Sequence, residues 1–386
     1  MLQTLTLAAL GERGTHNFIA RALAEADVQI NGSRPWDLRV HDSRMFRRIL
    51  FSGSLGLGES FIDRQWDCSD LDGFFTRVLQ ARLDERYHSP IDWLDGLRGL
   101  VTNRQRRSRS SEVARRHYDL HPELYRAMLG EERVYSCGYW RTATTLEEAQ
   151  TAKIDLCCRK LGLEPGMRLL DIGCGWGALA RHAAERYGVE VVGITVSCAQ
   201  AEVARERCRG LPITIREQDY RALNERFDRI VSVGMFEHVG PRNYRTYFDT
   251  VRRCLPSDGL FLLHTIGANG SFPAFDPWLD RYIFPNAVLP SAKWIHQAVE
   301  GRFVIEDWHH FGPDYDRTLM AWYHRLHEAW DALGTLEARG KQDDRAWRVW
   351  RYYLLACAGS FRARKSQLWQ VLMSPHGRQG GCPEVR

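Results

Sequence analysis

The sequence predicts an α/β protein in which a doubly wound, mostly parallel sheet follows a small α+β N-terminal domain. The chain has 386 residues, and single hydrophobic cores stop growing at about 250–300 residues, so two domains are expected. From residue 117 onward, strand and helix patterns alternate, as they do in parallel sheets. Hydrophobic residues make up 44% of the chain and charged residues 26%, which is an ordinary globular balance rather than that of a disordered chain.

The first part of the chain divides into a domain and a linker. Residues 1–100 indicate a small mixed domain, with a turn signal at Asn31-Gly32 between alternating apolar residues. A short helical pattern mixed with a glycine-rich connection follows, and then a helix over 71–83. Residues 101–116 carry six arginines against one glutamate and indicate a basic linker. That linker is either a plain connector or a strip that contacts anionic lipid or nucleic acid.

Residues 117–386 form the second predicted domain, a single α/β unit. The buried strand patterns lie at 167–173, 189–195, 212–219, 227–234 and 259–266, and the helical patterns at 177–187, 197–208 and 243–255. Ligands of such sheets bind beyond the carboxyl ends of the strands. No stretch has the roughly 18 uncharged apolar residues of a membrane span, and the N-terminus lacks the pattern of a signal peptide. The ten cysteines form no CxxC pair, so reduced thiols in the cytoplasm and no metal site are expected.

The turn after the first strand of this domain carries the main chemical motif. In LLDIGCGWGALA, Asp171 precedes Gly173, Gly175 and Gly177, and glycines at such a turn let the backbone approach a ligand closely. A dinucleotide site fits the same glycines but expects an acidic residue about 20 residues later, where this chain has Gly-Ile-Thr. The pattern resembles the first motif of methyltransferases that use S-adenosylmethionine, and a dinucleotide site or a purely structural turn are the alternatives.

Several further segments resemble the cyclopropane-fatty-acid synthases and the related mycolic acid cyclopropane synthases. They include LDIGCGWGALARHAAERYGVEVVGITVSCAQ, DRIVSVGMFEHVG and LLACAGSFRARKSQLWQVLMS. INGSRPWDLRV and GSLGLGESFIDRQW resemble the N-terminal domain of the bacterial phospholipid enzymes. One departure is His121-Pro122, where the family often has Gly-Asn. The resemblance implies transfer of a methylene group from S-adenosylmethionine to the cis double bond of unsaturated phospholipid acyl chains.

The resemblance also implies the surroundings of the reaction. A cytoplasmic homodimer would work on phospholipids at the inner face of the membrane without binding nucleic acid, and residues 1–100 would bind lipid or pair subunits. Methyl transfer to an alkene leaves a carbocation, so a base must remove a proton before the ring closes. In this family that base is a bound bicarbonate ion, and its ligands correspond to Cys137, Glu237, His264, Ile266 and Tyr315. Cys137 and Ile266 would act mainly through backbone groups.

Other site residues follow from the same resemblance. The cofactor would contact Tyr135, Ser136, Asp171, Gly173, Gly175, Thr195 and Gln200, with Asp219 and Tyr220 as weaker candidates near the adenine. The family sometimes assigns Cys357 to the active site, although a buried packing role fits chemistry that needs no covalent enzyme intermediate. Electron-rich rings stabilise cations, and the aromatic residues near the motifs either do so or pack in the core: Tyr135, Tyr139, Trp140 and Phe236.

Two other functions are compatible with the sequence. One is a methyltransferase of the same fold that leaves a methyl or methoxy branch on a lipid, or methylates a small amine. The other is a catalytically inactive lipid-binding protein. The intact glycine loop, together with Glu237, His264 and Tyr315, argues against loss of activity.

Overall fold

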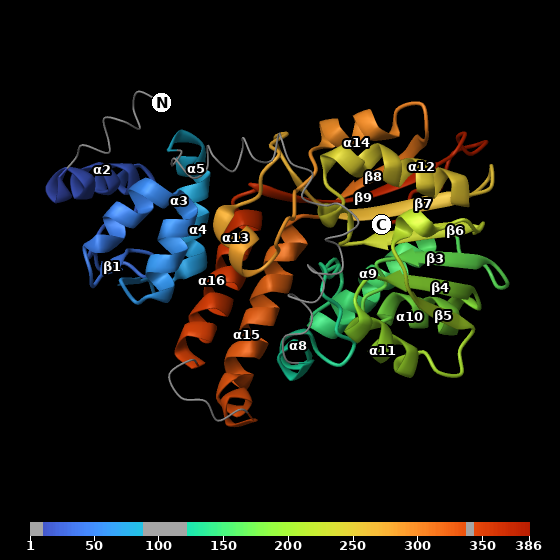
Figure 1. The fold of residues 1–386 in the computed structure, drawn as a ribbon, viewed down its shortest axis with the longest axis horizontal. Coiled ribbons are helices and arrows are strands. Elements are labelled where there is room, and N and C mark those ends of the chain that lie inside the picture. Colours follow the sequence, from blue (N-terminus) through green and yellow to red (C-terminus); the bar gives the residue numbers. More distant parts are fainter. Residues whose placement is uncertain (1–10, 88–121, 337–342) are drawn as a thin grey trace. The chain divides into compact units, whose positions relative to one another are not determined.

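The structure, a computed structural model, describes residues 11–87, 122–336 and 343–386 (Figure 1). The chain divides into two units by its internal contacts. The first comprises residues 1–102, 272–285 and 319–366, and the second comprises residues 103–271, 286–318 and 367–386. The predicted linker at 101–116 lies outside the described residues, as does His121.

The second unit is built on a seven-stranded sheet in the order β5-β4-β3-β6-β7-β9-β8. β3 pairs with β4 and β6 in parallel, β4 with β5 and β6 with β7 are also parallel, and β8 and β9 are antiparallel. This confirms the predicted doubly wound sheet and all five predicted strands. The strands are β3 (Arg168–Ile172), β4 (Glu190–Thr195), β5 (Ile213–Glu217), β6 (Arg229–Val233), β7 (Leu260–Ala268), β8 (Val304–His310) and β9 (Ser366–Ser374).

Helices cover both faces of this sheet (Figure 1). On one face, apolar residues of α9 and α10 pack with those of β3, β4 and β6 in one cluster. On the other face, α12 and α14 supply buried side chains such as Tyr247, Phe248 and Ile295 to a second cluster. The described helices of this unit are α8 (Pro122–Leu129), α9 (Leu146–Lys160), α10 (Ala178–Tyr187), α11 (Cys198–Arg207), α12 (Tyr244–Cys254), α14 (Ala292–Val299) and the first turns of α15 (Pro313–Leu336) up to residue 318, with short 3-10 turns η1 (Tyr220–Ala222), η2 (Phe236–His238) and η3 (Pro241–Asn243).

The first unit is mainly helical. It contains one two-stranded sheet, in which β1 (Arg39–Val40) pairs with β2 (Trp66–Asp67) in antiparallel fashion. Its helices are α2 (Glu12–Glu25), α3 (Arg44–Ile62), α4 (Leu71–Gln80), α5 (Leu83–Arg86), α13 (Pro277–Tyr282), α16 (Asp343–Arg362) and the part of α15 (Pro313–Leu336) from residue 319 onward.

This unit differs from the predicted domain of residues 1–100 because segments from much later in the chain complete its core. Tyr352 of α16 packs its ring against Phe61 and Phe75, with centroids 5.6 and 5.2 Å away. Trp278 of α13 lies 4.4 Å from the same tyrosine ring. A helix-rich unit of this size needs several apolar faces to bury one another, so residues predicted to belong to the α/β domain belong here instead.

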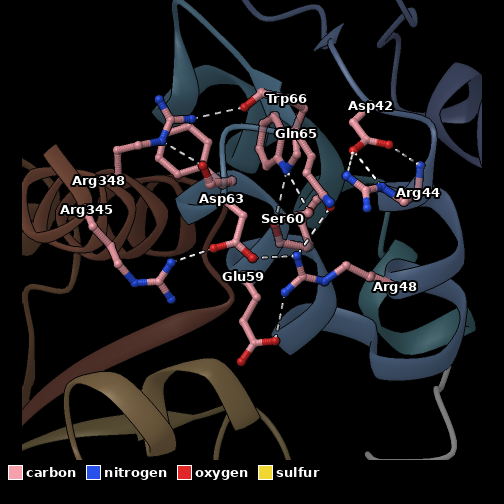
Figure 2. A network of polar contacts seen from close by, with 12 residues as sticks. Asp42, Arg44, Arg48, Glu59, Ser60, Asp63, Gln65, Trp66, Arg345 and Arg348 are labelled. Atoms are coloured by element: carbon pink, nitrogen blue, oxygen red, sulfur yellow. Dashed lines mark hydrogen bonds and ion pairs between the residues drawn. The ribbon is translucent and has the colours of Figure 1, made fainter. Parts of the chain in front are cut away.

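A polar network ties α16 to the end of α3 within this unit (Figure 2). Arg48 donates hydrogen bonds to Glu59 at 3.0 Å and to Asp63 at 2.7 Å, and Arg345 of α16 also donates to Asp63. The buried guanidinium of Arg348 donates to the backbone oxygens of Phe61 and Trp66 and to the Asp67 carboxylate. A planar guanidinium can satisfy several acceptors at once, and burial makes each of these bonds count more than an exposed ion pair.

One local prediction in this region is confirmed and one needs correction. The turn predicted at Asn31-Gly32 is present, with Asn31 at φ 55°, and the flanking residues Ile30 and Leu38 form a parallel bridge. The segment is organised around the buried Asp37, which accepts a hydrogen bond from the backbone of Gln29. The glycine-rich connection is part of α3, which continues through a kink at Gly53 with φ 54°.

Candidate active site

The predicted site residues follow the carboxyl ends of neighbouring parallel strands. The glycine loop follows β3, Thr195 ends β4, Asp219 follows β5, Glu237 follows β6, and His264 and Ile266 lie in β7. Strand order reverses between β3 and β6, and crevices for ligands form at such a reversal. The topology therefore brings these residues to one edge of one sheet, as the sequence predicts.

The glycine loop has the backbone that its sequence predicts. Gly173, Gly175 and Gly177 have φ values of 88°, 54° and 85°, a left-handed region that favours glycine. A Cβ atom added at Gly173 would lie 2.9 Å from the side chain of Met235. One added at Gly175 would meet no atom of the described chain within 4 Å. The loop at Gly175 thus borders space that the described part of the chain does not fill.

Asp171 lies at the start of this loop and is 2% exposed. Burial raises the pKa of its carboxyl to about 7, and the nearby positive charge of Lys153 acts in the opposite direction. A buried carboxyl whose pKa is near neutrality is typical of functional sites. Once ionised, Asp171 attracts a cationic group placed beyond the strand end.

Two residues of α9 that the sequence analysis missed fasten the segment before the sheet. Lys153 is buried and its ammonium donates to the Ser136 hydroxyl at 2.8 Å, while Gln150 donates to the Ser136 carbonyl at 2.7 Å. Residues three apart lie on one helix face, so both reach the same segment. Burial lowers the pKa of Lys153. The sequence signal that could have identified Gln150 and Lys153 is their spacing of three residues on a helix face whose other residues are mostly apolar and buried.

The predicted residues after β4 and β5 bond mostly to their own neighbours. The Thr195 hydroxyl donates to the Gln200 side chain at 3.0 Å and accepts from the backbone of Ser197 at 3.2 Å. Asp219 caps η1 by accepting from the backbone of Arg221 at 2.9 Å. Tyr220 is buried, with its ring 5.1 Å from that of Tyr247. These contacts hold the loops at the strand ends in defined conformations.

Glu237 has one satisfied and one unsatisfied oxygen in a buried environment. Its Oε1 accepts from the backbone N–H of Ile266 at 2.6 Å, while Oε2 has no hydrogen-bond partner among the described residues. Burial raises the pKa of this carboxyl to about 7, although the hydrogen bond from Ile266 opposes that shift. The backbone N–H of Ile266 thus fixes Glu237, and the role of Ile266 as a ligand of bicarbonate stays a prediction.

His264 has the complementary arrangement. The Gln370 amide donates to His264 Nδ1 at 3.3 Å, so with the amide in this orientation the neutral ring carries its proton on Nε2. His264 Nε2 is buried and has no partner among the described residues. Burial lowers the pKa of the imidazole well below its usual value, so the ring stays neutral and offers a hydrogen-bond donor. Gln370 on β9 is another residue that the sequence analysis missed.

Of the remaining predicted site residues, Cys137 and Tyr315 lie in the unit that contains the seven-stranded sheet, and Cys357 lies in the other unit. Cys137 is fully buried, and its thiol donates to the Gly138 carbonyl at 3.1 Å. Burial raises the pKa of this thiol well above its usual value, which suits a role through the backbone. Tyr315 is buried in the first turn of α15, in the same unit. Cys357 lies on α16 in the other unit, where burial also raises its thiol pKa, and its assignment to the active site stays a prediction.

The aromatic residues named in the sequence analysis separate into site and core. Tyr139 packs its ring 5.3 Å from Phe311, which lies 5.7 Å from the ring of His264. Phe236, in contrast, stacks on Tyr244 at 4.3 Å in the core below α12. Tyr139 is therefore placed beside the site, whereas Phe236 packs the core.

Comparison with known proteins identifies the family. The family model described as mycolic acid cyclopropane synthetase matches residues 105–371. The chain belongs to the cyclopropane synthase family. It is 52% identical over 367 residues to the cyclopropane-fatty-acyl-phospholipid synthase of Escherichia coli K12, with 94% of each chain covered. It is 36% identical over 267 residues to cyclopropane mycolic acid synthase 1 of Mycobacterium tuberculosis, which covers 64% of this chain and 91% of that one.

Solved structures agree with this membership. The cyclopropane synthase MmaA2 of M. tuberculosis matches 68% of this chain and 98% of its own, with a TM-score of 0.63 and 34% identity. CmaA1, solved with S-adenosylhomocysteine, matches with a TM-score of 0.62 and 33% identity. The cyclopropane synthase described here is thus an enzyme that uses S-adenosylmethionine, and the glycine loop with its open flank at Gly175 fits that cofactor.

Proposed function

We propose that this enzyme adds a methylene group across cis double bonds of unsaturated phospholipid acyl chains, with a bound bicarbonate ion as the base. The relative that matches 94% of the chain is named for a fatty-acyl-phospholipid product. The observation that carries the proposal is the pair of buried polar atoms, Glu237 Oε2 and His264 Nε2, that lack partners in the described chain. Buried polar groups without partners are rare and call for a ligand.

The chemistry of this pair fits an oxyanion that carries a proton. The His264 N–H is a donor for a charged oxygen, and an ionised Glu237 is an acceptor for a hydroxyl group. Bicarbonate offers both a charged oxygen and a hydroxyl, whereas carbonate has no proton to donate. The phenol of Tyr315 and the backbone at Cys137 would complete the set. When bound, bicarbonate supplies a base for the proton that leaves before ring closure.

The residues of the chain fulfil the other needs of the reaction. S-adenosylmethionine supplies an electrophilic methyl group on a sulfonium. Asp171, ionised above about pH 7, would attract the cofactor's ammonium, and the glycine loop would give its backbone close approach. The rings of Tyr139 and Phe311 beside His264 would stabilise positive charge on the substrate and exclude water that would otherwise trap it.

The substrate's location implies docking at a membrane surface. Among the helices that the structure describes, none is long and apolar enough to cross a bilayer. We therefore propose peripheral association, with the six arginines of residues 101–116 each contributing on the order of 1 kcal/mol near an anionic leaflet. Sedimentation with anionic vesicles should weaken steeply with salt, and should not change with salt if another surface does the docking. A homodimer stays a prediction, and analytical ultracentrifugation of the purified protein tests it.

Lipid analysis tests the proposed reaction. Cells that make the protein should accumulate phospholipid acyl chains heavier by one CH₂ and lacking the double bond, and cells that make the Gly175→Asp variant should not. Mass spectrometry with fragmentation separates a ring from a methyl or methoxy branch. Branched products would show a methyltransferase with a different outcome, and unchanged lipids would show that unsaturated phospholipids are not the substrate.

A further inference from the structure

A second set of contacts lies next to the proposed bicarbonate site and is not explained by it. The segment 136–140 carries Cys137, and it is held on one side by α9 through the bonds of Lys153 and Gln150 to Ser136. On its other side it meets the first turns of α15. Two of the contacts from α15 are made by one buried hydroxyl, that of Thr318.

Thr318 is fully buried and uses every hydrogen-bonding position of its hydroxyl. Its Oγ1 accepts from the backbone N–H of Gly138 at 3.0 Å and from the indole N–H of Trp140 at 2.9 Å. It donates to the carbonyl of Asp314, one helical turn earlier, at 2.8 Å. A threonine hydroxyl has one donor and two acceptor sites, which these three partners fill, and two of the partners belong to the segment that carries Cys137. The Cys137 thiol makes a fourth, longer contact with the same oxygen at 3.8 Å.

Neighbouring residues of α15 add to the same attachment. The Asp314 carboxylate accepts from the backbone N–H of Trp140 at 2.7 Å. Arg317 donates to the Trp140 carbonyl at 3.2 Å, and its guanidinium lies 4.6 Å from the centre of the indole ring. These contacts surround Trp140, whereas Thr318 alone reaches back to Gly138, the residue after Cys137. Among the contacts from α15, the bond of Thr318 to Gly138 thus acts most directly on the backbone of Cys137.

Thr318 also connects two groups of the proposed bicarbonate site. Tyr315 lies three residues earlier on the same helix, and residues three apart share a helix face. We propose that Thr318 is a positioning residue for the reaction, which holds the backbone at Cys137 in register with the phenol of Tyr315 so that both reach the bound base. This inference rests on the proposed function, because it assigns Thr318 a role at that base.

The decisive comparison is between Thr318→Val and Thr318→Ser. Valine has nearly the shape of threonine but cannot accept the Gly138 and Trp140 N–H groups, whereas serine keeps the hydroxyl. A displacement of about 1 Å at a reacting group can cost on the order of 10²-fold in rate. We expect Thr318→Val to lose about that much in kcat and to need more bicarbonate for half-maximal rate, while its affinity for S-adenosylhomocysteine in calorimetry stays unchanged. Thr318→Ser should restore most of the rate and the bicarbonate response.

Thr250→Val is the matched control for a lost buried hydroxyl. Thr250 is also buried in a helix of the same unit, and its hydroxyl donates to the carbonyl of Thr246 one turn earlier at 2.9 Å. This hydrogen bond lies within its own helix and does not involve the 136–140 segment. This variant should keep the wild-type kcat and bicarbonate response. A second variant, Trp140→Phe, removes only one of the two donors to Thr318 and should lose less rate in the same direction.

The results separate positioning from packing. Wild-type kcat in Thr318→Val, equal losses in Thr318→Val and Thr250→Val, or a loss of S-adenosylhomocysteine binding along with rate would each overturn the inference. If Thr318→Val does not fold, Trp140→Phe decides, and an unaltered rate and bicarbonate response in that variant would overturn it. Failure of the proposed function appears in the wild-type enzyme itself, as no ring product or no response to bicarbonate, and is therefore distinguishable.

Discussion

The cofactor loop and the proposed bicarbonate site lie along one edge of one sheet but are built in opposite ways. Around the cofactor loop, Thr195 bonds to Gln200 and Asp219 to Arg221, and the buried Tyr220 hydroxyl is left without a partner among the described residues. In the proposed bicarbonate site, both Glu237 Oε2 and His264 Nε2 are buried without partners in the described chain. The first region is thus mostly satisfied by its own side chains, whereas the second leaves an acid and an imidazole for a ligand to satisfy.

This difference follows from the size of the two ligands. A large cofactor can be bound by backbone and shape, so a loop of positive-φ glycines and a well-ordered frame suffice. A small anion has few atoms and must be held by groups that have no other partner, at a cost of about 1–3 kcal/mol for each buried polar group left unsatisfied in its absence. The account therefore predicts that changes in the two regions have separable effects on cofactor binding, rate and stability.

The largest effect is expected from Gly175→Asp. A Cβ added at Gly175 meets no described atom within 4 Å, and the positive φ adds backbone strain of about 1–2 kcal/mol, but the carboxylate enters the cofactor's space and adds a charge. Calorimetry should show that S-adenosylhomocysteine binding is lost. Gly210→Asp is the control, since Gly210 also has positive φ and open space but lies between α11 and β5, away from the strand ends. Unchanged binding in Gly175→Asp, or equal loss in Gly210→Asp, would contradict the site.

Glu237→Gln should impair chemistry while sparing the cofactor. We expect kcat to fall about 10²–10³-fold, as for other positioned polar groups, with S-adenosylhomocysteine affinity unchanged. Because burial raises the pKa of Glu237 to about 7, wild-type kcat should rise with pH through that value as the carboxyl ionises, and the variant should lack this step. Rate measurements between pH 6 and pH 8 check both points. A loss of cofactor affinity in this variant would contradict the prediction that the two regions have separable effects.

Lys153→Met should have a smaller effect, and we expect it in the pH dependence of cofactor affinity. The Lys153 charge lowers the pKa of Asp171, which burial raises to about 7, so its removal should raise that pKa further. As the pH is lowered, the variant should lose cofactor affinity at a higher pH than the wild type, with a midpoint about one pH unit higher. At pH 7 this shift corresponds to an affinity roughly tenfold weaker. Gln150→Met, which removes a neutral contact to the same segment, should leave the midpoint in place. Equal midpoints in all three proteins would refute this role.

The smallest effect is expected on the stability of Glu237→Gln. Losing a polar contact usually destabilises a protein, whereas this substitution should stabilise it at high pH. The pKa of Glu237 is raised in the folded state from an ordinary 4.5 to about 7. The folded protein therefore binds more protons in that window, and its stability falls as pH rises through it. Glu237→Gln removes this term, so the variant should gain about 1–3 kcal/mol at pH 8 and little at pH 5. Thermal melting at both values checks the sign, and an equal change at both would contradict it.

Local signals in the sequence were sufficient for most of the α/β unit. The five parallel strands and the helices α10, α11 and α12 follow from apolar runs and helical spacing, and the turns at Gly173 and Gly175 follow from the motif itself. β8 and β9 were not predicted. They lie far from the other strands in the sequence, and pairing between distant antiparallel segments has no local signature.

The parts that could not be predicted depend on contacts between distant residues. Nothing local to residues 319–366 shows that Tyr352 packs with Phe61 and Phe75 of the first unit. The proposed bicarbonate ligands likewise lie on four separate segments, and they came from family resemblance rather than spacing. Thr318 and Lys153 escaped notice because a buried polar side chain in a helix is recognised only when its partners on other elements are known.

The most direct test of the account is the dependence of the initial rate on bicarbonate in carbonate-depleted buffer. The wild-type enzyme, presented with vesicles of unsaturated phospholipid and S-adenosylmethionine, should be slow in that buffer and should recover to a saturating rate as bicarbonate is added. Its affinity for S-adenosylhomocysteine should be the same at every bicarbonate concentration. A full rate in depleted buffer, in the wild type or in Glu237→Ala, would contradict the claim that Glu237 and His264 hold the base.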